Sequence, residues 1–507
     1  MASVTTLPSG ARTEHRGLAF WMDRVLKELA VVRASPDADS VHDLRVAIRR
    51  CRSIASVMEE VDPHPAWHAM RKVARKLFRG LGALRDAQVM EDWIKHLGAE
   101  SDPLRAELLA GFQSKEQELR EEALHVAERF DEKAWTRLGR TLRQRVRLVP
   151  PGSLVAECLA LERYHEAREL HGDALRTEKP KPWHALRIGL KRFRYTVENL
   201  LPEHHAAWSE KLKRVQDLLG EVHDLDVLTG VVKGASSNAA QSRETWLETI
   251  LHERRERMEK YRQLTLGKTS LWSEWRHALP HGERLETASM ARLRATARAA
   301  DAHPRRSSQI AHIAVALFQK LGRVKAGPAF ADPKLLRVFC GAAQLHGVSA
   351  AGTSKSQQKA ARRFLLDLTI PPGWSAEEWE LLAWTVRYHR GAEPRSKRGA
   401  FAKLSEIQQR NIRVLAGTLR LARALRKSGI TSPVGLRAEK SVDAIIVRVP
   451  GLTDSVESAA RLAAGKHLLE SRLDSPLLLM PSGVQEKIVA LPAPDPQVPL
   501  FSTVASY

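Results

Sequence analysis

A basic amphipathic segment that occurs twice constrains this chain more than any other feature. The first copy runs Val41-His42-Asp43-Leu44-Arg45-Val46-Ala47-Ile48-Arg49-Arg50-Cys51-Arg52, and the second runs Trp183-His184-Ala185-Leu186-Arg187-Ile188-Gly189-Leu190-Lys191-Arg192-Phe193-Arg194-Tyr195. Without a gap, the matched pairs are His42 and His184, Arg45 and Arg187, Arg49 and Lys191, Arg50 and Arg192, and Arg52 and Arg194. At about 100° per residue, His42, Arg45, Arg49 and Arg52 form a stripe about 80° wide beside an apolar stripe. Each copy is therefore predicted to be a helix with one packing face and one cationic face.

The two cationic faces favour an anionic ligand over an ordinary solvent-exposed surface. Exposed helix faces usually mix the two signs, with Glu and Lys one turn apart. Two like-charged faces repel each other unless a polyanion neutralises them. The chain has 81 Lys and Arg against 59 Asp and Glu, a formal net charge of +22, so nucleic acid, an anionic membrane surface or polyphosphate is the expected kind of partner. For the two histidines, a structural role with a hydrogen bond to a backbone carbonyl is an equal alternative.

Length and composition indicate a multidomain protein of a reducing compartment. The 507 residues suggest two to four domains, and the 43% of hydrophobic residues are enough for packed cores. Cys51, Cys158 and Cys340 are scattered and odd in number, so they predict neither a disulfide framework nor a zinc site. The first residues, 1–12, lack an apolar segment, and no run approaches the ~18 apolar residues of a membrane span. We expect a cytoplasmic protein without a membrane span.

The order of predicted helices repeats around the two basic segments. Ser40 is a plausible N-cap for the first basic helix, and the other helices of this half are expected over residues 13–34, 66–97, 104–130, 135–148, 153–175, 206–232 and 241–264. A second matched pair, Gly82-Ala83-Leu84-Arg85-Asp86-Ala87 and Gly220-Glu221-Val222-His223-Asp224-Leu225, supports the repeat. In this register Arg75 matches Lys213, and Lys76 matches Arg214. Two four-helix units related by duplication are the predicted architecture.

On these motifs, residues 13–265 resemble the CHAD family, the conserved histidine α-helical domain. Leu212-Lys213-Arg214-Val215-Gln216-Asp217-Leu218-Leu219-Gly220 and Asp224-Leu225-Asp226 add to the resemblance. It implies two helical bundles around a basic groove that binds inorganic polyphosphate, in some members at storage granules. The residues that inherit the groove role by position are His42, Arg45, Arg49, Arg50, Arg52, His184, Arg187, Lys191, Arg192 and Arg194, followed by Arg75, Lys76, Lys213 and Arg214.

A physical argument supports the same ligand. Polyphosphate carries about one negative charge per phosphate and has no bases to read, so its binder needs many cations facing one channel and gains from counterion release. Arg supplies bidentate forks and Lys supplies point charges. A histidine gains charge as the pH falls, which would strengthen binding in acid.

A third region, residues 305–430, is predicted to be helical and resembles the HD-like C-terminal domain of the exopolyphosphatase/guanosine pentaphosphate phosphatase family. The resemblance rests on Ala342-Ala343-Gln344-Leu345-His346, on Trp384 through Pro394, and on Leu415 through Leu425. An active HD site needs His and Asp ligands for a divalent metal. Gly347 and Arg423 occupy the two Asp positions, and the stretch from Ser354 to Lys359 lacks the intervening histidines. We therefore expect a metal-free HD relic without cofactor or catalytic residues, in which His346 and His389 lie in the core or face phosphate.

The C-terminal residues are predicted to form a small strand–helix–strand unit. Its strands are expected at 443–449 and 477–480, with a helix over 455–470 between them. The full prediction is a mainly α chain of five parts: a CHAD-like domain at 13–265, a helical connector at 266–304, the HD-like domain at 305–430, a small α+β unit at 434–482 and a flexible tail at 483–507.

These features favour one function over two alternatives. The favoured function is non-catalytic polyphosphate binding, at storage granules or beside a polyphosphate-metabolising enzyme as a further partner. The second is a polyphosphate or triphosphate hydrolase or its accessory subunit. The nearest match to the Glu-x-Glu-x-Lys signature of tunnel-type triphosphatases, Glu116-Gln117-Glu118-Leu119-Arg120, has a helical context and ends in Arg. The third is RNA or DNA binding, which is disfavoured because aromatic residues make up 6% of the chain and no stacking platform is evident.

Overall fold

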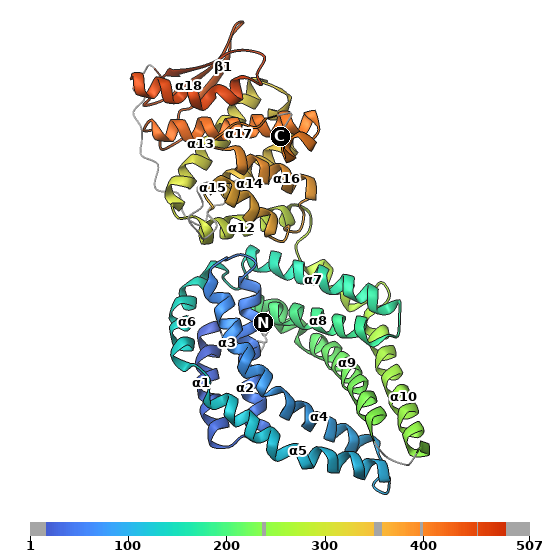
Figure 1. Ribbon diagram of the computed structural model, residues 1–507. Helices are drawn as coiled ribbons and strands as arrows, with labels where there is room; N and C mark the ends of the chain where they lie inside the picture. Colours follow the sequence, from blue (N-terminus) through green and yellow to red (C-terminus); the bar gives the residue numbers. More distant parts are fainter. Residues whose placement is uncertain (1–16, 236–239, 349–356, 396–398, 454, 483–507) are drawn as a thin grey trace, which may run out of the picture. The chain divides into compact units, whose positions relative to one another are not determined.

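The computed structural model describes residues 17–235, 240–348, 357–395, 399–453 and 455–482. These residues form eighteen α-helices and one three-stranded sheet, so the predicted mainly α class with a small α+β unit is confirmed. The chain divides into two compact units, which are described separately (Figure 1). Unit 1 comprises residues 1–304 and 344–383, and unit 2 comprises residues 305–343 and 384–507. None of the helices in the described ranges combines the length and apolar character that crossing a bilayer requires.

The first twelve helices belong to unit 1. They are α1 (Leu18–Ala34), α2 (Ala38–Met58), α3 (Pro65–Gly80), α4 (Gly82–Leu97), α5 (Pro103–Glu128), α6 (Glu132–Arg145), α7 (Leu154–Leu175), α8 (Pro180–Leu200), α9 (Pro202–Gly234), α10 (Ala240–Thr265), α11 (Leu271–Ala278) and α12 (Gly282–Ala300). Helices α2 and α8 are the two basic segments. Their apolar stripes are fully buried, which confirms the predicted packing faces: Leu44, Ile48, Cys51 and Ala55 in α2, and Leu186, Leu190, Phe193 and Val197 in α8.

The duplication is visible in the order of the helices, with one difference between the copies. Helices α1, α2, α3 with α4, and α5 correspond to α7, α8, α9 and α10. The prediction of one helix over 66–97 was wrong, because the helix is interrupted at Leu81, between α3 and α4. Two glycines flank the break and lower the helix propensity there. A Cβ on Gly80 would lie 2.5 Å from Val126, so glycine also lets α5 approach closely.

The start of the first basic helix also differs from the prediction. Helix α2 begins at Ala38, and the side chain of Asp37 is its N-cap, accepting a hydrogen bond from the backbone N–H of Ser40 at 2.8 Å. Ser40 is therefore not the N-cap. Its hydroxyl donates instead to the carbonyl of Ser35, also at 2.8 Å. Asp accepts this bond more effectively here because its carboxylate also faces the positive end of the helix dipole.

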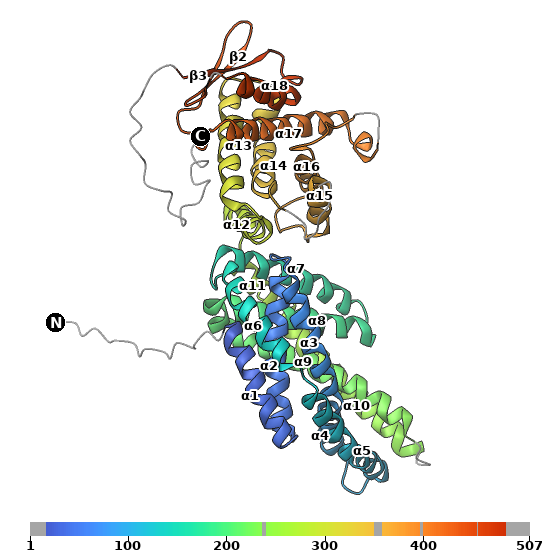
Figure 2. The ribbon, with the colours of Figure 1, turned by 60° about the vertical axis from the view of Figure 1, so that its left-hand side comes forward.

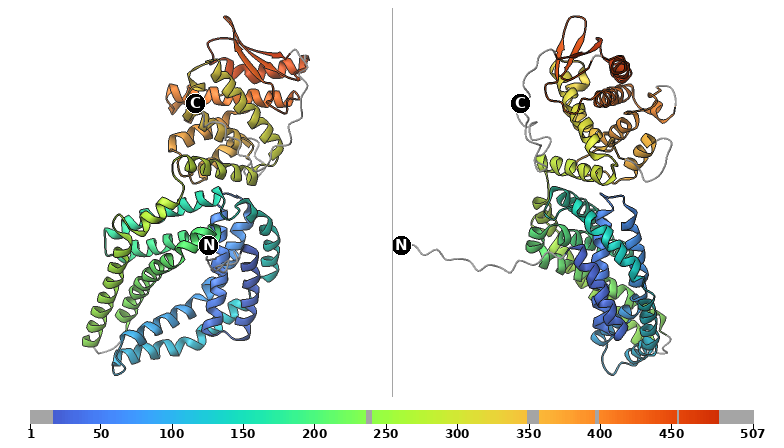
Figure 3. Two further views of the ribbon diagram at one scale, coloured as in Figure 1. Left: turned by 180° about the vertical axis from the view of Figure 1, so that it is seen from behind. Right: turned by 90° about the vertical axis from the view of Figure 1, so that its left-hand side faces the viewer.

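Two hydrophobic clusters hold unit 1 together. The larger cluster joins the body of the unit through fully buried rings such as Trp67, Trp183 and Phe193. The smaller cluster joins the α4–α5 pair to the α9–α10 pair, through Met90, Ile94, Leu104, Leu225, Leu228 and Ile250. In Figure 1 and from behind in Figure 3, these two helix pairs run outward from the body and meet at their far ends. Helices α2 and α8 belong to the body, and α3 with α4, and α9, follow them along the chain.

Unit 2 contains the sheet and the helices that support it. The remaining helices of the chain are α13 (Pro304–Arg323), α14 (Pro333–Leu345), α15 (Gln357–Asp367), α16 (Ala376–Tyr388), α17 (Glu406–Lys427) and α18 (Val456–Glu470), and the boundary between the units falls within α14 and α16. The strands are β1 (Arg437–Lys440), β2 (Ile445–Val449) and β3 (Leu477–Pro481).

The small C-terminal unit has the two predicted strands, with the helix between them, and one further strand. Strands β2 and β3 are parallel and joined by α18, whereas β1, which the sequence did not predict, pairs antiparallel with β2 (Figure 2). Helix α18 packs closely on α17, because Gly417 has no Cβ to meet the backbone of Leu469 and Gly465 has none to meet Ala424. The predicted tail at 483–507 lies outside the described residues.

Candidate anion-binding site

Contacts between α2 and α8 bring the two basic helices together. The side-chain amide of Asn199 donates to the hydroxyl of Ser53 at 3.0 Å, and Arg50 forms an ion pair with Glu198. The guanidinium of Arg50 also lies 5.3 Å from the ring centroids of both Trp21 and Tyr195. Arg50 therefore joins the two helices, which is a structural role, and it does not line the cavity described next.

A cavity of about 670 Å³ opens between the basic faces of the two helices. Six of the fourteen predicted residues line it: Arg45, Arg49, Arg52, Arg187, Lys191 and Arg192. Four further basic residues that were not predicted line it too: Arg71, Arg85, Arg163 and His223. The lining also includes the carboxylates of Asp86 and Asp224, the rings of Phe78 and Tyr195, and the hydroxyls of Ser53, Ser56 and Thr196. The arrangement concentrates cations from both copies of the duplicated segment on one space.

Aromatic rings position several of these guanidinium groups. The guanidinium groups of Arg45 and Arg52 both lie over the ring of Phe78, at 4.4 and 4.9 Å from its centroid. Arg45 also donates to the backbone carbonyl of Phe78 at 3.2 Å. Arg49 lies 5.8 Å from the ring centroid of Tyr195. Because stacking uses the face of a guanidinium, the N–H groups in its plane stay available for an oxyanion.

Most of the cations in the cavity have no carboxylate partner. Within the described ranges, Arg45, Arg49, Arg52, Arg85, Arg187 and Lys191 form no ion pair with a carboxylate within 4.0 Å. The Nε of Arg187 is buried and has no hydrogen-bond partner. A buried N–H of a charged group without a partner is costly, and an anionic ligand would supply the missing acceptor. By contrast, Arg192 is paired with Glu166, and Arg163 contacts both Glu60 and Glu166 at 2.9 Å.

Crowding of positive charge changes the protonation of the lining. Burial, followed by the charges of Arg187 and Arg49, lowers the pKa of Lys191 to about 7. Burial also lowers the pKa of Arg187, which Asp224 opposes. The pKa of Asp224 is raised by burial against the attraction of Arg187 and Lys191. Near pH 7, Lys191 is therefore uncharged in about half of the molecules.

The two predicted histidines lie in different surroundings. The Nδ1 of His184 lies 3.1 Å from the Nδ1 of His223, so one ring donates and the other accepts. Burial, Arg187 and His184 together lower the pKa of His223 to about 4. His42 is exposed and outside the cavity, and burial followed by Arg85 lowers its pKa. Neither predicted histidine is hydrogen-bonded to a backbone carbonyl in the described part of the chain, so that structural alternative is not what the geometry shows.

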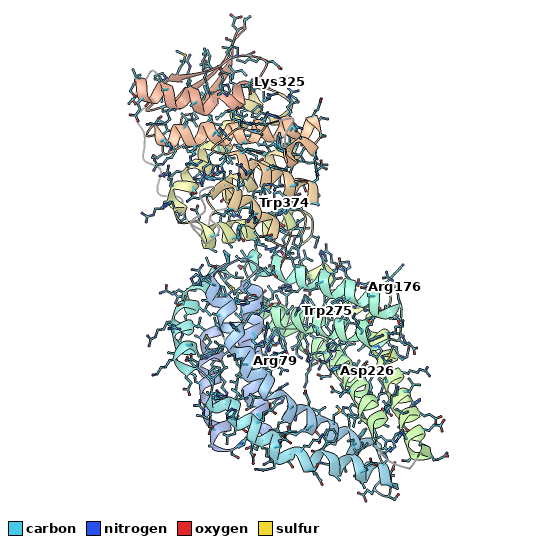
Figure 4. All side chains as sticks on the ribbon, viewed as in Figure 1. Arg79, Arg176, Asp226, Trp275, Lys325 and Trp374 are labelled. Carbon is cyan, nitrogen blue, oxygen red and sulfur yellow. The ribbon has the colours of Figure 1, made fainter. Side chains whose placement is uncertain are left out.

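The other predicted residues lie outside the cavity lining. Arg75 and Lys76 on α3, and Lys213 and Arg214 on α9, are exposed. His184 contacts the cavity only through His223, and Arg194 is half-buried behind it. Asp226, labelled in Figure 4, is not a lining residue either, because it accepts a 2.7 Å bond from Arg254 on α10.

A signal in the sequence could have identified two of the missed residues. Arg85 and His223 occupy matching positions of the second repeated segment, as do Asp86 and Asp224. Arg163 had no comparable signal, because it lies in the mixed-charge stretch Glu162-Arg163-Tyr164-His165-Glu166, which is typical of a solvated helix face.

The HD-like region contains two buried histidines, one of which contacts an arginine. His346 and His389 are 4% and 1% exposed. The Nδ1 of His389 lies 2.6 Å from the carbonyl of Val386, and its Nε2 lies 3.4 Å from Arg423. No group of three His, Cys, Asp or Glu side chains suited to a metal occurs among the residues whose placement is described. Ser354, Lys355 and Ser356 of the predicted ligand-free stretch lie outside those residues.

Comparisons with known proteins agree with both resemblances. Residues 17–233 match the family model of the CHAD domain, and residues 292–455 match that of Ppx/GppA phosphatase, domain III. Both predicted resemblances are confirmed, in this order along the chain. Among solved structures, the crystal structure of the CHAD domain from the plant Ricinus communis is 24% identical, with a TM-score of 0.35, and the match covers 52% of this chain and 90% of that chain. Comparison with curated proteins finds no match.

Proposed function

From a chain that carries a CHAD domain and a Ppx/GppA domain III, we propose a protein that binds inorganic polyphosphate in the cavity between α2 and α8. One observation carries the proposal: Arg45, Arg49, Arg52, Arg187 and Lys191 face a single cavity without carboxylate partners among the described residues. A polymer with about one charge per phosphate neutralises such a set and releases its counterions.

The lining favours polyphosphate over RNA. Single-stranded nucleic acids gain much of their affinity from bases stacked on exposed aromatic rings. The two rings in the lining already contact guanidinium groups, Phe78 those of Arg45 and Arg52, and Tyr195 those of Arg49 and Arg50. A base would have to displace these arginines, whereas a phosphate chain uses them where they are.

We expect binding that weakens steadily with salt. The logarithm of the affinity for long polyphosphate should fall linearly with the logarithm of the salt concentration, because bound phosphates release condensed cations. Filter binding with labelled polyphosphate, in competition with RNA of equal total charge, measures both the slope and the preference. A flat salt response, or a preference for the RNA, would contradict the proposal.

The proposed role is non-catalytic, and the hydrolase alternative is directly testable. Arg423 stands where an HD metal site needs a carboxylate, and a hydrolase of that type needs the metal to generate hydroxide near neutral pH. The triphosphatase-like string at residues 116–120 lies within helix α5, where Arg120 pairs with Glu116 at 2.6 Å. Glu116 and Arg120 therefore pair with each other along the helix, whereas the tunnel-type signature lies on a strand.

The purified chain is therefore expected to release no phosphate from polyphosphate or guanosine pentaphosphate, with Mg²⁺, with Mn²⁺ or without either ion. Malachite-green detection of phosphate and elemental analysis of the protein measure this. Steady turnover that EDTA abolishes, and that His346→Ala also abolishes, would establish the hydrolase function instead.

Location, partners and domain limits belong to the same proposal. We propose that the protein associates with polyphosphate storage granules and that the Ppx/GppA domain III supports binding or docks a polyphosphate-metabolising enzyme. The division at residues 13–265, 266–304, 305–430, 434–482 and 483–507 also stays a proposal. Limited proteolysis with mass spectrometry of the fragments would test these limits.

A further inference from the structure

Unit 2 contains a second cluster of basic side chains, which the cavity in unit 1 does not involve. Arg420, Arg423 and Lys427 lie one helical turn apart on one face of α17. Arg306 belongs to the first turn of α13, and Arg390 follows the end of α16. A hydrogen bond of 2.5 Å from Arg426 to the side chain of Gln309 places the first turns of α13 against the C-terminal half of α17. These five residues, Arg306, Arg390, Arg420, Arg423 and Lys427, are called the arginine cluster below.

The members of the cluster have different roles. Arg420 donates to the backbone carbonyls of Tyr388, Gly391 and Ala392 at 2.8, 2.8 and 3.2 Å, so its donors hold the loop after α16. Arg423 is half-buried, and its guanidinium lies 3.4 Å from Nε2 of His389. Because the Nδ1 of His389 faces the carbonyl of Val386, its Nε2 is an acceptor, and His389 orients Arg423 without neutralising it.

Three members of the cluster have no ion pair with a carboxylate among the described residues. Within the described ranges, Arg306, Arg423 and Lys427 form no ion pair with Asp or Glu. Glu393, which attracts Arg420, forms an ion pair with His467. Burial, then Arg390, Arg306 and Arg420, lower the pKa of Arg423 to about 10. The first turn of α13 has no acidic residue, so its free N–H groups add further positive potential.

We propose that the arginine cluster is a binding site for a phosphoryl group, with Arg423 as its central ligand and Arg306 and Lys427 at its rim. The half-buried guanidinium of Arg423, with Arg306 and Lys427 beside it and no ion pair to a carboxylate in the described residues, favours an anion as the ligand. A dianionic phosphoryl oxygen set matches the planar fork of Arg423 and the point charge of Lys427. The group is either free orthophosphate or the end of a short polyphosphate chain.

Isothermal titration of the full chain tests the site once the cavity in unit 1 is disabled. The background is the cavity variant, in which Arg45, Arg49, Arg187 and Lys191 are all replaced by Ala. Orthophosphate and tripolyphosphate are titrated separately into it. Both are expected to bind at one site; equal affinities identify free orthophosphate as the ligand, and at least tenfold tighter binding of tripolyphosphate identifies a chain end. No binding of either probe to the folded background would overturn the proposal.

Two substitutions in that background test the role of Arg423. Arg423→Gln should weaken binding of the better probe at least tenfold, and Arg423→Lys should weaken it less. Arg410→Gln is the matched control, because Arg410 lies exposed on the same helix and the change in charge is identical. Equal weakening by Arg410→Gln and Arg423→Gln would contradict the site. Far-UV circular dichroism and the melting temperature of each variant exclude an effect of misfolding, and binding of long polyphosphate to the wild-type chain reports on the proposed function separately.

Discussion

Replacing Arg45, Arg49, Arg187 and Lys191 together by Ala should weaken polyphosphate binding at least a hundredfold, while the far-UV circular dichroism stays helical. Each desolvated contact between such a side chain and a phosphate contributes on the order of 1 kcal/mol, so four lost contacts exceed the ~2.8 kcal/mol of a hundredfold change. The fold should tolerate the change, because none of the four side chains forms an ion pair with a carboxylate in the described structure. Unchanged affinity in the folded variant would place the site elsewhere.

A second quadruple variant separates the cavity from the net charge. The control changes four exposed residues outside the lining: Arg75, Lys76, Lys213 and Arg214. Their joint replacement by Ala removes four basic side chains, as many as the cavity variant does. We expect a loss of less than tenfold, because these cations act on a bound chain only through screened, longer-range attraction. Equal losses in the two variants would show that binding follows the total charge and that the cavity has no special role.

Affinity for polyphosphate should fall by up to about tenfold per pH unit between pH 7.5 and 9.5, because Lys191 must be protonated to bind a phosphate. Burial and the charges of Arg187 and Arg49 lower the pKa of Lys191 to about 7. A bound polyanion favours the ammonium form and raises this pKa, so binding takes up a proton. The contribution is complete below pH 7 and is lost as the pH rises toward the pKa of the bound state. Fluorescence-anisotropy titrations at fixed ionic strength measure the slope.

Lys191→Arg is the control for this pH dependence. A guanidinium remains charged over the whole range, so the variant should bind with nearly constant affinity from pH 7.5 to 9.5. Polyphosphate itself contributes little to the slope there, because its terminal groups titrate near pH 6. A slope that persists unchanged in Lys191→Arg would assign the proton to another group.

The sequence predicted the helices of unit 1 well because their apolar stripes are long and regular. The burial of Leu44 and Ile48, and of Leu186 and Leu190, follows from that periodicity alone. It did not predict the break at Leu81, because the apolar pattern continues through the two flanking glycines. The four-residue strand β1 was missed because its exposed, charged residues carry no alternating apolar pattern.

For the site, the repeated segment predicted which helices face each other but not which of their residues share a space. Arg50 and Arg45 both match a basic residue of the second copy, yet Arg50 is bound by Glu198 and two rings whereas Arg45 faces the cavity. The match between the copies included Arg50, although at about 100° per residue it lies outside the basic stripe that contains Arg45. Arg71 and Arg163 were missed for a different reason, because their neighbours in space come from distant parts of the chain.

The cavity receives its cations from two copies of one segment, and this origin bears on how a polymer can enter it. A nucleic acid strand has chemically different ends, so a site that reads it must distinguish the two directions of travel. A linear polyphosphate reads the same from either end. Arg45 and Arg187, and Arg49 and Lys191, are corresponding residues of the two copies, so a chain turned end for end meets equivalent partners. Under the proposed function, we therefore expect either end of a linear polyphosphate to enter the cavity first.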